Sequence, residues 1–195
     1  MSNPLRFSAG IILASVIFSA AIATPPVAGA ASTSQTPSPC SMLSRSDVEA
    51  VGPAKPIRRL IPEDELAVVP PHGMGCDWIS PTTAHRDPKA IFGVGLALWD
   101  FRKLGPAWST RWGTKSRKYA QTLCNERPPP GSGVRLPTVH VVRGVGDYAC
   151  ATDTSIQVAK GPFYLIVSLG LNAPNSESRQ TLIQLARKAS GRLPR

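Results

Sequence analysis

The sequence lacks the patterns that usually mark an enzyme or a metalloprotein. It contains only three histidines in 195 residues, and no His-Glu-x-x-His, Gly-x-Ser-x-Gly or Cys-x-x-Cys pattern. Such patterns supply the nucleophile and base of a hydrolase, or the ligands of zinc. We therefore expect a non-catalytic protein that holds no metal or other cofactor.

Acidic residues are also scarce. Lys and Arg number 22 against 12 Asp and Glu, which gives a formal net charge of +10. The hydrophobic fraction of 42% is too high for a disordered polymer, and 20 Pro with 16 Gly predict many turns and few long helices. The length and the lack of internal repeats indicate one compact domain, which we expect to be monomeric.

Only the start of the chain holds a long apolar run. A single cation, Arg6, precedes the uncharged stretch 9–23, and the small residues Ala28-Gly29-Ala30 follow. This order is typical of a secretory signal peptide, and the run is shorter than the about 20 residues that span a membrane. We predict a signal peptide over 1–30, cleaved after Ala30. The alternative is that the segment is retained as an anchor.

The segment after this point is rich in Ser, Thr and Pro and is expected to be a flexible leader over 31–39. No cysteine follows the apolar run at lipobox distance, because Cys40 comes too late, so a lipoprotein is not expected. The remaining residues, 40–193, are expected to form a single α+β domain.

All four cysteines, Cys40, Cys76, Cys124 and Cys150, lie in that domain. An even count in an exported chain predicts two disulfides. Zinc binding and a reactive thiol are the alternatives, although neither has supporting residues at a suitable spacing. Of the three pairings, we favour Cys40–Cys76 and Cys124–Cys150, which close separations of 36 and 26 residues.

Hydrophobic periodicity predicts an antiparallel sheet covered by an N-terminal, a middle and a C-terminal helix, an α+β fold. Ser44 and Asp47 are spaced as a capping box, and Gly93 indicates a bulge or a close backbone approach. The helices are expected at 41–52, 104–124 and 176–189, and the strands at 57–61, 75–80, 90–99, 139–145, 154–159 and 163–169.

Cations and aromatic residues alternate through the middle helix. Trp108, Trp112, Tyr119 and Leu123 form one stripe at a period of 3.6 residues. The surrounding cations form a candidate anion-binding group: Arg102, Lys103, Arg111, Lys115, Arg117 and Lys118. In the cytosol this composition would suggest nucleic acid. An exported protein would instead meet anionic cell-wall polymers or phospholipid head groups. The alternative is a helix whose aromatics pack and whose cations are merely solvated.

Other candidate residues are weaker. The histidines His72, His85 and His140 are expected in loops or on an outward strand face. The segment Gly144-Val145-Gly146 before Asp147 indicates a tight turn rather than a phosphate loop, and the acidic cluster 63–65 a solvated loop.

Two further functions remain open as alternatives. An enzyme could combine scattered groups such as Asp77, Asp147 and His140. A small-ligand carrier could use Trp78 and Trp99 to line a cavity.

Four short motifs, in order, resemble the actinobacterial domain-of-unknown-function family 3558. They are Pro39-Cys40-Ser41-Met42-Leu43, Ser46-Asp47-Val48, Gly75-Cys76-Asp77-Trp78 and Arg143-Gly144-Val145-Gly146-Asp147-Tyr148-Ala149. The resemblance covers residues 39–193 and implies a small α+β protein that is exported to the cell envelope, often as a lipoprotein. The missing lipobox departs from that pattern. The expected function is therefore binding of an anionic envelope component or an envelope protein.

Overall fold

The computed structural model describes residues 35–51, 55–62, 72–80, 91–126, 137–171 and 176–194. These residues belong to one compact unit, Ser34–Arg195. The predicted signal peptide and the start of the leader lie outside the described residues. So do His85 and the acidic cluster at 63–65.

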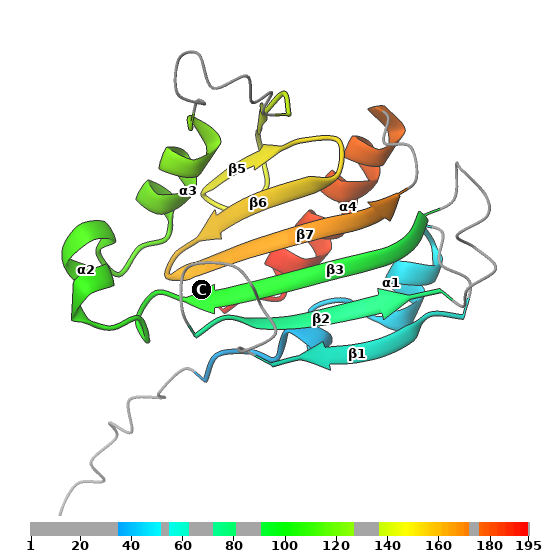
Figure 1. The fold of residues 1–195 in the computed structure, drawn as a ribbon, viewed down its shortest axis with the longest axis horizontal. Helices are drawn as coiled ribbons and strands as arrows, with labels where there is room; N and C mark the ends of the chain where they lie inside the picture. Colours follow the sequence, from blue (N-terminus) through cyan, green and yellow to red (C-terminus); the bar gives the residue numbers. More distant parts are fainter. Residues whose placement is uncertain are drawn as a thin grey trace, which may run out of the picture. The chain divides into compact units, whose positions relative to one another are not determined.

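Seven antiparallel strands form a single sheet in the order β1-β2-β3-β7-β6-β5-β4 (Figure 1). The strands are β1 (Ile57–Ile61), β2 (Met74–Ile79), β3 (Ile91–Asp100), β4 (His140–Val142), β5 (Tyr148–Ala151), β6 (Ser155–Lys160) and β7 (Phe163–Leu171). All six predicted strands are present, and β5 was not predicted.

The strand expected over 139–145 was predicted too long. It ends at Val142, because Gly144 and Gly146 take positive φ angles of 73° and 59° and turn the chain into β5. The irregularity expected at Gly93 is confirmed, since the register between β3 and β7 shifts between Ile91 and Gly93. Both findings place glycines where the backbone leaves the regular ladder.

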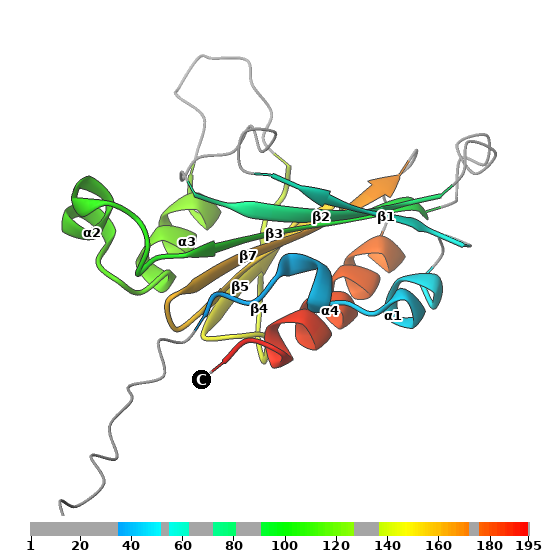
Figure 2. The ribbon, with the colours of Figure 1, turned by 90° about the horizontal axis from the view of Figure 1, so that it is seen from below.

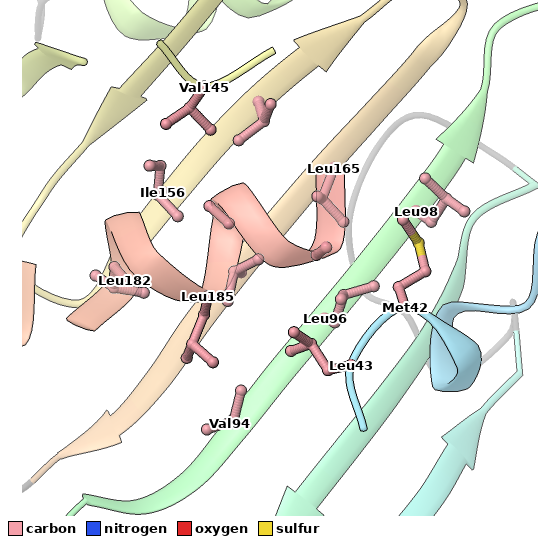
Figure 3. Packing of buried hydrophobic residues seen from close by; sticks show 14 of the residues in the cluster. Met42, Leu43, Val94, Leu96, Leu98, Val145, Ile156, Leu165, Leu182 and Leu185 are labelled. Carbon is pink, nitrogen blue, oxygen red and sulfur yellow. The ribbon is translucent and has the colours of Figure 1, made fainter. Parts of the chain in front are cut away.

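One face of the sheet is covered by the chain ends. The 3-10 helix η1 (Pro39–Ser41), α1 (Arg45–Glu49) and α4 (Ser176–Gly191) lie on this side (Figure 2). The capping box is confirmed, because the Ser44 hydroxyl accepts from the Asp47 N–H and the Asp47 carboxylate accepts from the Ser44 N–H. In Figure 3, Leu182 and Leu185 of α4 point toward the sheet within the main core. The predicted inward stripe of α4 is fully buried.

The middle helix is two helices, not the single helix predicted over 104–124. α2 (Pro106–Trp112) ends at Gly113, and α3 (Arg117–Cys124) begins after Ser116. They pack on the opposite face of the sheet over a second core of aromatic residues, which contains Trp99, Phe101, Tyr119 and Tyr164. Successive side chains of a strand alternate between the faces, so Leu98 belongs to the first core and Trp99 to the second.

Both disulfides form as predicted. Cys40–Cys76 joins η1 to β2, and Cys124–Cys150 joins α3 to β5, with Cα–Cα distances of 5.1 and 6.2 Å. The leader was predicted too long, because the Thr36 hydroxyl donates to Asp100 and Pro39 is buried in η1. In the described part of the chain, no helix has the length and apolar character needed to cross a membrane.

Candidate anion-binding groove

The first wall of the groove is α2. Its start is set by Gly105, the N-cap, and by Pro106, whose missing N–H suits the first helical position. Its end is set by Gly113, whose N–H donates to the Ser109 carbonyl at 2.8 Å and whose φ is 74°. Only glycine adopts the observed φ and ψ of 74° and −168° readily, so the chain reverses here.

The second wall, α3, is fixed at both ends. Ser116 is fully buried, and its hydroxyl donates to the Phe163 carbonyl at 2.5 Å, which holds the helix start against β7. Cys124, the last residue of α3, is bonded to Cys150 of β5. These two attachments fix α3 to the sheet, while α2 is joined to α3 through the four residues 113–116.

Tyr119 of α3 joins the two helices to the sheet. Its ring meets Trp108 and Trp112 of α2 edge to face, at centroid distances of 5.7 and 5.2 Å. On the other side it meets Tyr164 of β7 in the same geometry at 5.1 Å. This geometry is the favourable one for aromatic pairs, and it leaves both tryptophans partly exposed.

The space between α2 and α3 is an open groove of about 750 Å³. Its lining combines the aromatic residues with two cations, two amides, a hydroxyl and a carboxylate. The lining residues that the structure describes are Trp108, Arg111, Trp112, Lys118, Tyr119, Gln121, Thr122, Leu123, Asn125 and Glu126.

Both cations of the groove lie against one indole. The guanidinium of Arg111 is 4.8 Å from the centre of the Trp112 ring, and the Lys118 ammonium is 5.9 Å from it. Lys118 also donates to the Arg111 carbonyl at 3.1 Å. Within the described residues neither side chain forms an ion pair, so both charges remain available to an anion from solution.

Two tyrosines under the groove stay protonated at physiological pH. Burial raises the pKa of the Tyr119 phenol, and the nearby Glu126 carboxylate raises it further. Burial also raises the pKa of Tyr164 far above its usual 10.0, and its hydroxyl donates to Gln157 at 2.7 Å. The phenols therefore add no negative charge that would oppose an anion.

The structure divides the six predicted cations. Arg111 and Lys118 line the groove, whereas Lys103, Lys115 and Arg117 are exposed outside its lining. Arg102 binds the buried carboxylate of Asp100 in a two-pronged ion pair, with its shorter N–O distance 2.6 Å, and its guanidinium lies 5.1 Å from the Phe163 ring centre. Arg102 is thus a structural cation of the turn after β3.

The scattered polar residues do not converge. Asp77 is on β2 and His140 on β4, five strand spacings apart, or roughly 24 Å along the sheet at about 4.8 Å per strand. Asp147 lies at the far end of the β4–β5 hairpin from His140. The turn predicted at Gly144-Val145-Gly146 is confirmed by the positive φ angles of both glycines, and the Asp147 carboxylate accepts the Gly161 N–H at 2.6 Å. Burial raises the pKa of Asp77, and Arg59 partly offsets this effect.

The two tryptophans proposed for a carrier cavity are core residues. Trp78 and Trp99 are 1% and 0% exposed, and they pack in the two different cores on opposite faces of the sheet. They line no common cavity. Among the described residues, no group of three or more His, Cys, Asp or Glu side chains could hold a metal ion.

The polar residues of the groove were not predicted. Gln121 belongs to α3 and Asn125 is its C-cap, and the Asn125 amide donates to the Gln121 carbonyl at 2.8 Å at the end of the helix. Their part in a groove depends on the reversal at Gly113, which brings α2 alongside them. A sequence signal did exist, because Gly113 interrupts an otherwise helical aromatic stripe.

Comparison of this chain with models of known protein families, with curated proteins and with solved structures finds no match.

Proposed function

We propose that this protein is an exported domain of the cell envelope that binds an anionic envelope component in the α2–α3 groove, without catalysis. The observation that carries the proposal is the pair of cations, Arg111 and Lys118, which lie against Trp112 in the lining of a groove with aromatic residues. Cations beside an aromatic surface suit a ligand with an anionic group and an apolar or ring-shaped body.

The proposed location has support from the chemistry of the chain. The two disulfides require an oxidising compartment to form and persist. The N-terminal pattern of a cation, an apolar run and small residues is typical of export, and the resemblance to family 3558 implies the envelope. In that location, the polyanions within reach are cell-wall polymers and lipid head groups.

The test is retention of the purified, oxidised protein on isolated cell wall and on vesicles containing phosphatidylglycerol, each at low and high salt. The variant Arg111→Glu/Lys118→Glu removes the groove cations, and Lys103→Glu/Lys115→Glu makes the same charge change outside the groove. Loss of two cations at about 1 kcal/mol each near an anionic surface weakens binding roughly thirtyfold, and the two added carboxylates repel the ligand further, so we expect the groove variant to bind at least roughly thirtyfold more weakly. We expect the control variant to bind much more tightly than the groove variant does.

Comparison of retention on cell wall with retention on vesicles identifies the class of ligand. Retention on cell wall alone identifies a wall polymer, and retention on vesicles alone identifies a lipid head group. Equal losses in both variants would reject the groove and leave only attraction by net charge. Binding that does not respond to salt would reject the anionic ligand.

A further inference from the structure

The edge of the sheet at β1 has the properties of a strand-accepting surface. β1 is the outermost strand beside β2, and no described element lies beyond it (Figures 1 and 2). The opposite edge, β4, is only three residues long, whereas β1 has five. An outermost strand has backbone N–H and C=O groups that are free to pair with another chain.

β1 also exposes large apolar side chains. Ile57 is 66% exposed on one face, beside Ile79 of β2, which is 40% exposed, and Leu60 is 57% exposed on the other face. Exposed apolar residues that gather at a sheet edge mark an interaction site more often than a solvated surface.

Two hollows flank the same strand on the face that carries η1 and α1. Arg58 and Leu60 point to this face, because they pair with Trp78 and Cys76 of β2. The larger hollow, of about 520 Å³, is lined by Arg45, Pro56, Ile57, Arg58 and Trp78. The other, of about 430 Å³, is lined by Ser38, Cys40, Ser41, Arg58 and Leu60.

Arg58 belongs to both hollows, which therefore follow one another along β1. An added strand would present alternate side chains to this face, about 7 Å apart. Two alternate side chains of the added strand could therefore enter the two hollows, one in each. This is the arrangement in which backbone hydrogen bonds supply affinity and alternate pockets supply specificity.

The charge of the edge selects an acidic partner. The side chain of Arg58 is exposed and makes no hydrogen bond or ion pair within the described residues, and neither hollow has an acidic residue in its described lining. Arg59 points to the other face, where Asp77 is its neighbour on β2 and interacts with it electrostatically. A strand laid against β1 would meet Ile57, Arg58, Arg59 and Leu60 in succession, which suits the order apolar, acidic, acidic, apolar.

A second copy of this chain is a poor occupant. Antiparallel self-pairing about a two-fold axis centred on β1 would place Arg59 opposite Arg59 of the other copy, and a shift of the register by one residue would bring Arg58 opposite Arg59. Like charges directly opposite each other on paired strands are destabilising. The two arginines therefore oppose self-association and favour an acidic chain.

We propose that β1 binds an extended acidic segment of another envelope protein as an additional strand of the sheet, with the pattern apolar-acidic-acidic-apolar. This interaction is separate from the groove between α2 and α3.

The test uses the full oxidised protein and a fluorescent peptide with Ile-Glu-Asp-Leu at its centre, followed by fluorescence anisotropy. We expect saturable binding that Arg58→Glu/Arg59→Glu weakens at least about tenfold. A peptide with Ile-Lys-Lys-Leu should bind the reversed variant and not the natural protein. This exchange also shows that the variant is folded. Arg111→Glu/Lys118→Glu should bind the first peptide normally, which separates this proposal from the groove.

A second peptide tests the strand itself. N-methyl groups on its central amides remove the backbone donors while keeping every side chain, and we expect them to abolish binding. Equal binding of the methylated peptide, or equal loss in the groove variant, would overturn the proposal. So would a dimer of the natural protein, seen in sedimentation, that the Arg58→Glu/Arg59→Glu variant dissolves.

Discussion

One carboxylate, Asp47, ties the N-terminal helix to the C-terminal one. It accepts hydrogen bonds from Lys188 and Arg192, both at 2.8 Å, and from the Ser44 N–H at 2.9 Å. Burial alone would raise its pKa, but the hydrogen bonds from Lys188, Ser44 and Arg192 outweigh burial and hold the pKa well below the usual 3.8. The ionised form of Asp47 therefore stabilises the fold.

The sign of this effect predicts the pH dependence of Asp47→Asn. Because the pKa of Asp47 is lower in the folded protein than its usual 3.8, its carboxylate stabilises the fold at pH values above 3.8. This stabilisation is lost as the pH falls below 3.8 and the carboxylate becomes protonated in the folded protein. We expect Asp47→Asn to lower the free energy of unfolding by about 1–3 kcal/mol at pH 7. The difference from the natural protein should shrink below pH 3.8. Urea unfolding at pH 7 and in acid measures it.

The matched control is Asp153→Asn. Its partner is Arg179 at 2.7 Å, and the Asp153 side chain is 45% exposed. An exposed pair of this kind contributes less than about 1 kcal/mol. If Asp47→Asn kept the same acid sensitivity as the natural protein, the role assigned to the Asp47 carboxylate would be wrong.

At the scale of elements, the sequence predicted best where periodicity extends over a whole element. α4 and the β6–β7 hairpin follow their predicted ranges closely, because a stripe or an alternation identifies them. β5 was missed, since its four residues, Tyr148–Ala151, are too few to show a pattern. The favoured cysteine pairing is confirmed, although the sequence alone could not choose among the three possible pairings.

The middle helix was predicted wrongly for a physical reason. A glycine within a helix costs only about 1 kcal/mol, so the sequence alone does not decide whether Gly113 continues the helix or ends it. The aromatic stripe is real, but the tryptophans reach Tyr119 from a separate helix. The cations were grouped by their closeness in sequence, and after the reversal only Arg111 and Lys118 line the groove.

The same glycine gives a prediction for the groove. Gly113→Ala introduces a Cβ that meets no atom within 4 Å, so its cost is backbone strain alone, about 1–3 kcal/mol. We expect the strain to be relieved by displacing α2, which would weaken groove binding. Thermal unfolding and the retention assay measure the two effects.

Gly105→Ala is the control, because its Cβ also meets open space and the φ of Gly105 is an ordinary −61°. We expect a loss of at most about 1 kcal/mol, because alanine is a poorer N-cap than glycine, and normal groove binding. Equal behaviour of the two variants would show that the reversal at Gly113 does not depend on glycine.

At the scale of the whole molecule, the sheet separates two cores, and the two disulfides attach elements on opposite faces of it. Cys40–Cys76 attaches η1 on the face of α4, and Cys124–Cys150 attaches α3 on the face of the groove. The two loops span residues 40–76 and 124–150 and do not overlap, so their effects on the unfolded chain should add.

Removal of the disulfides should therefore have different effects on stability and on binding. Each disulfide stabilises the fold by about 3–4 kcal/mol, because it lowers the entropy of the unfolded chain. Loss of both would therefore remove an amount comparable to the whole free energy of unfolding of a typical domain, about 5–15 kcal/mol. We expect the double removal to leave a marginal fold, and each single removal a folded protein. Of the single variants, only Cys124→Ser/Cys150→Ser should also weaken groove binding, because it frees the end of α3.

Thermal unfolding measures the loss of stability, and the retention assay measures the loss of groove binding. Equal groove binding by the two single variants would show that Ser116 alone fixes α3. A fully stable double variant would remove the chemical reason for placing this domain in an oxidising compartment.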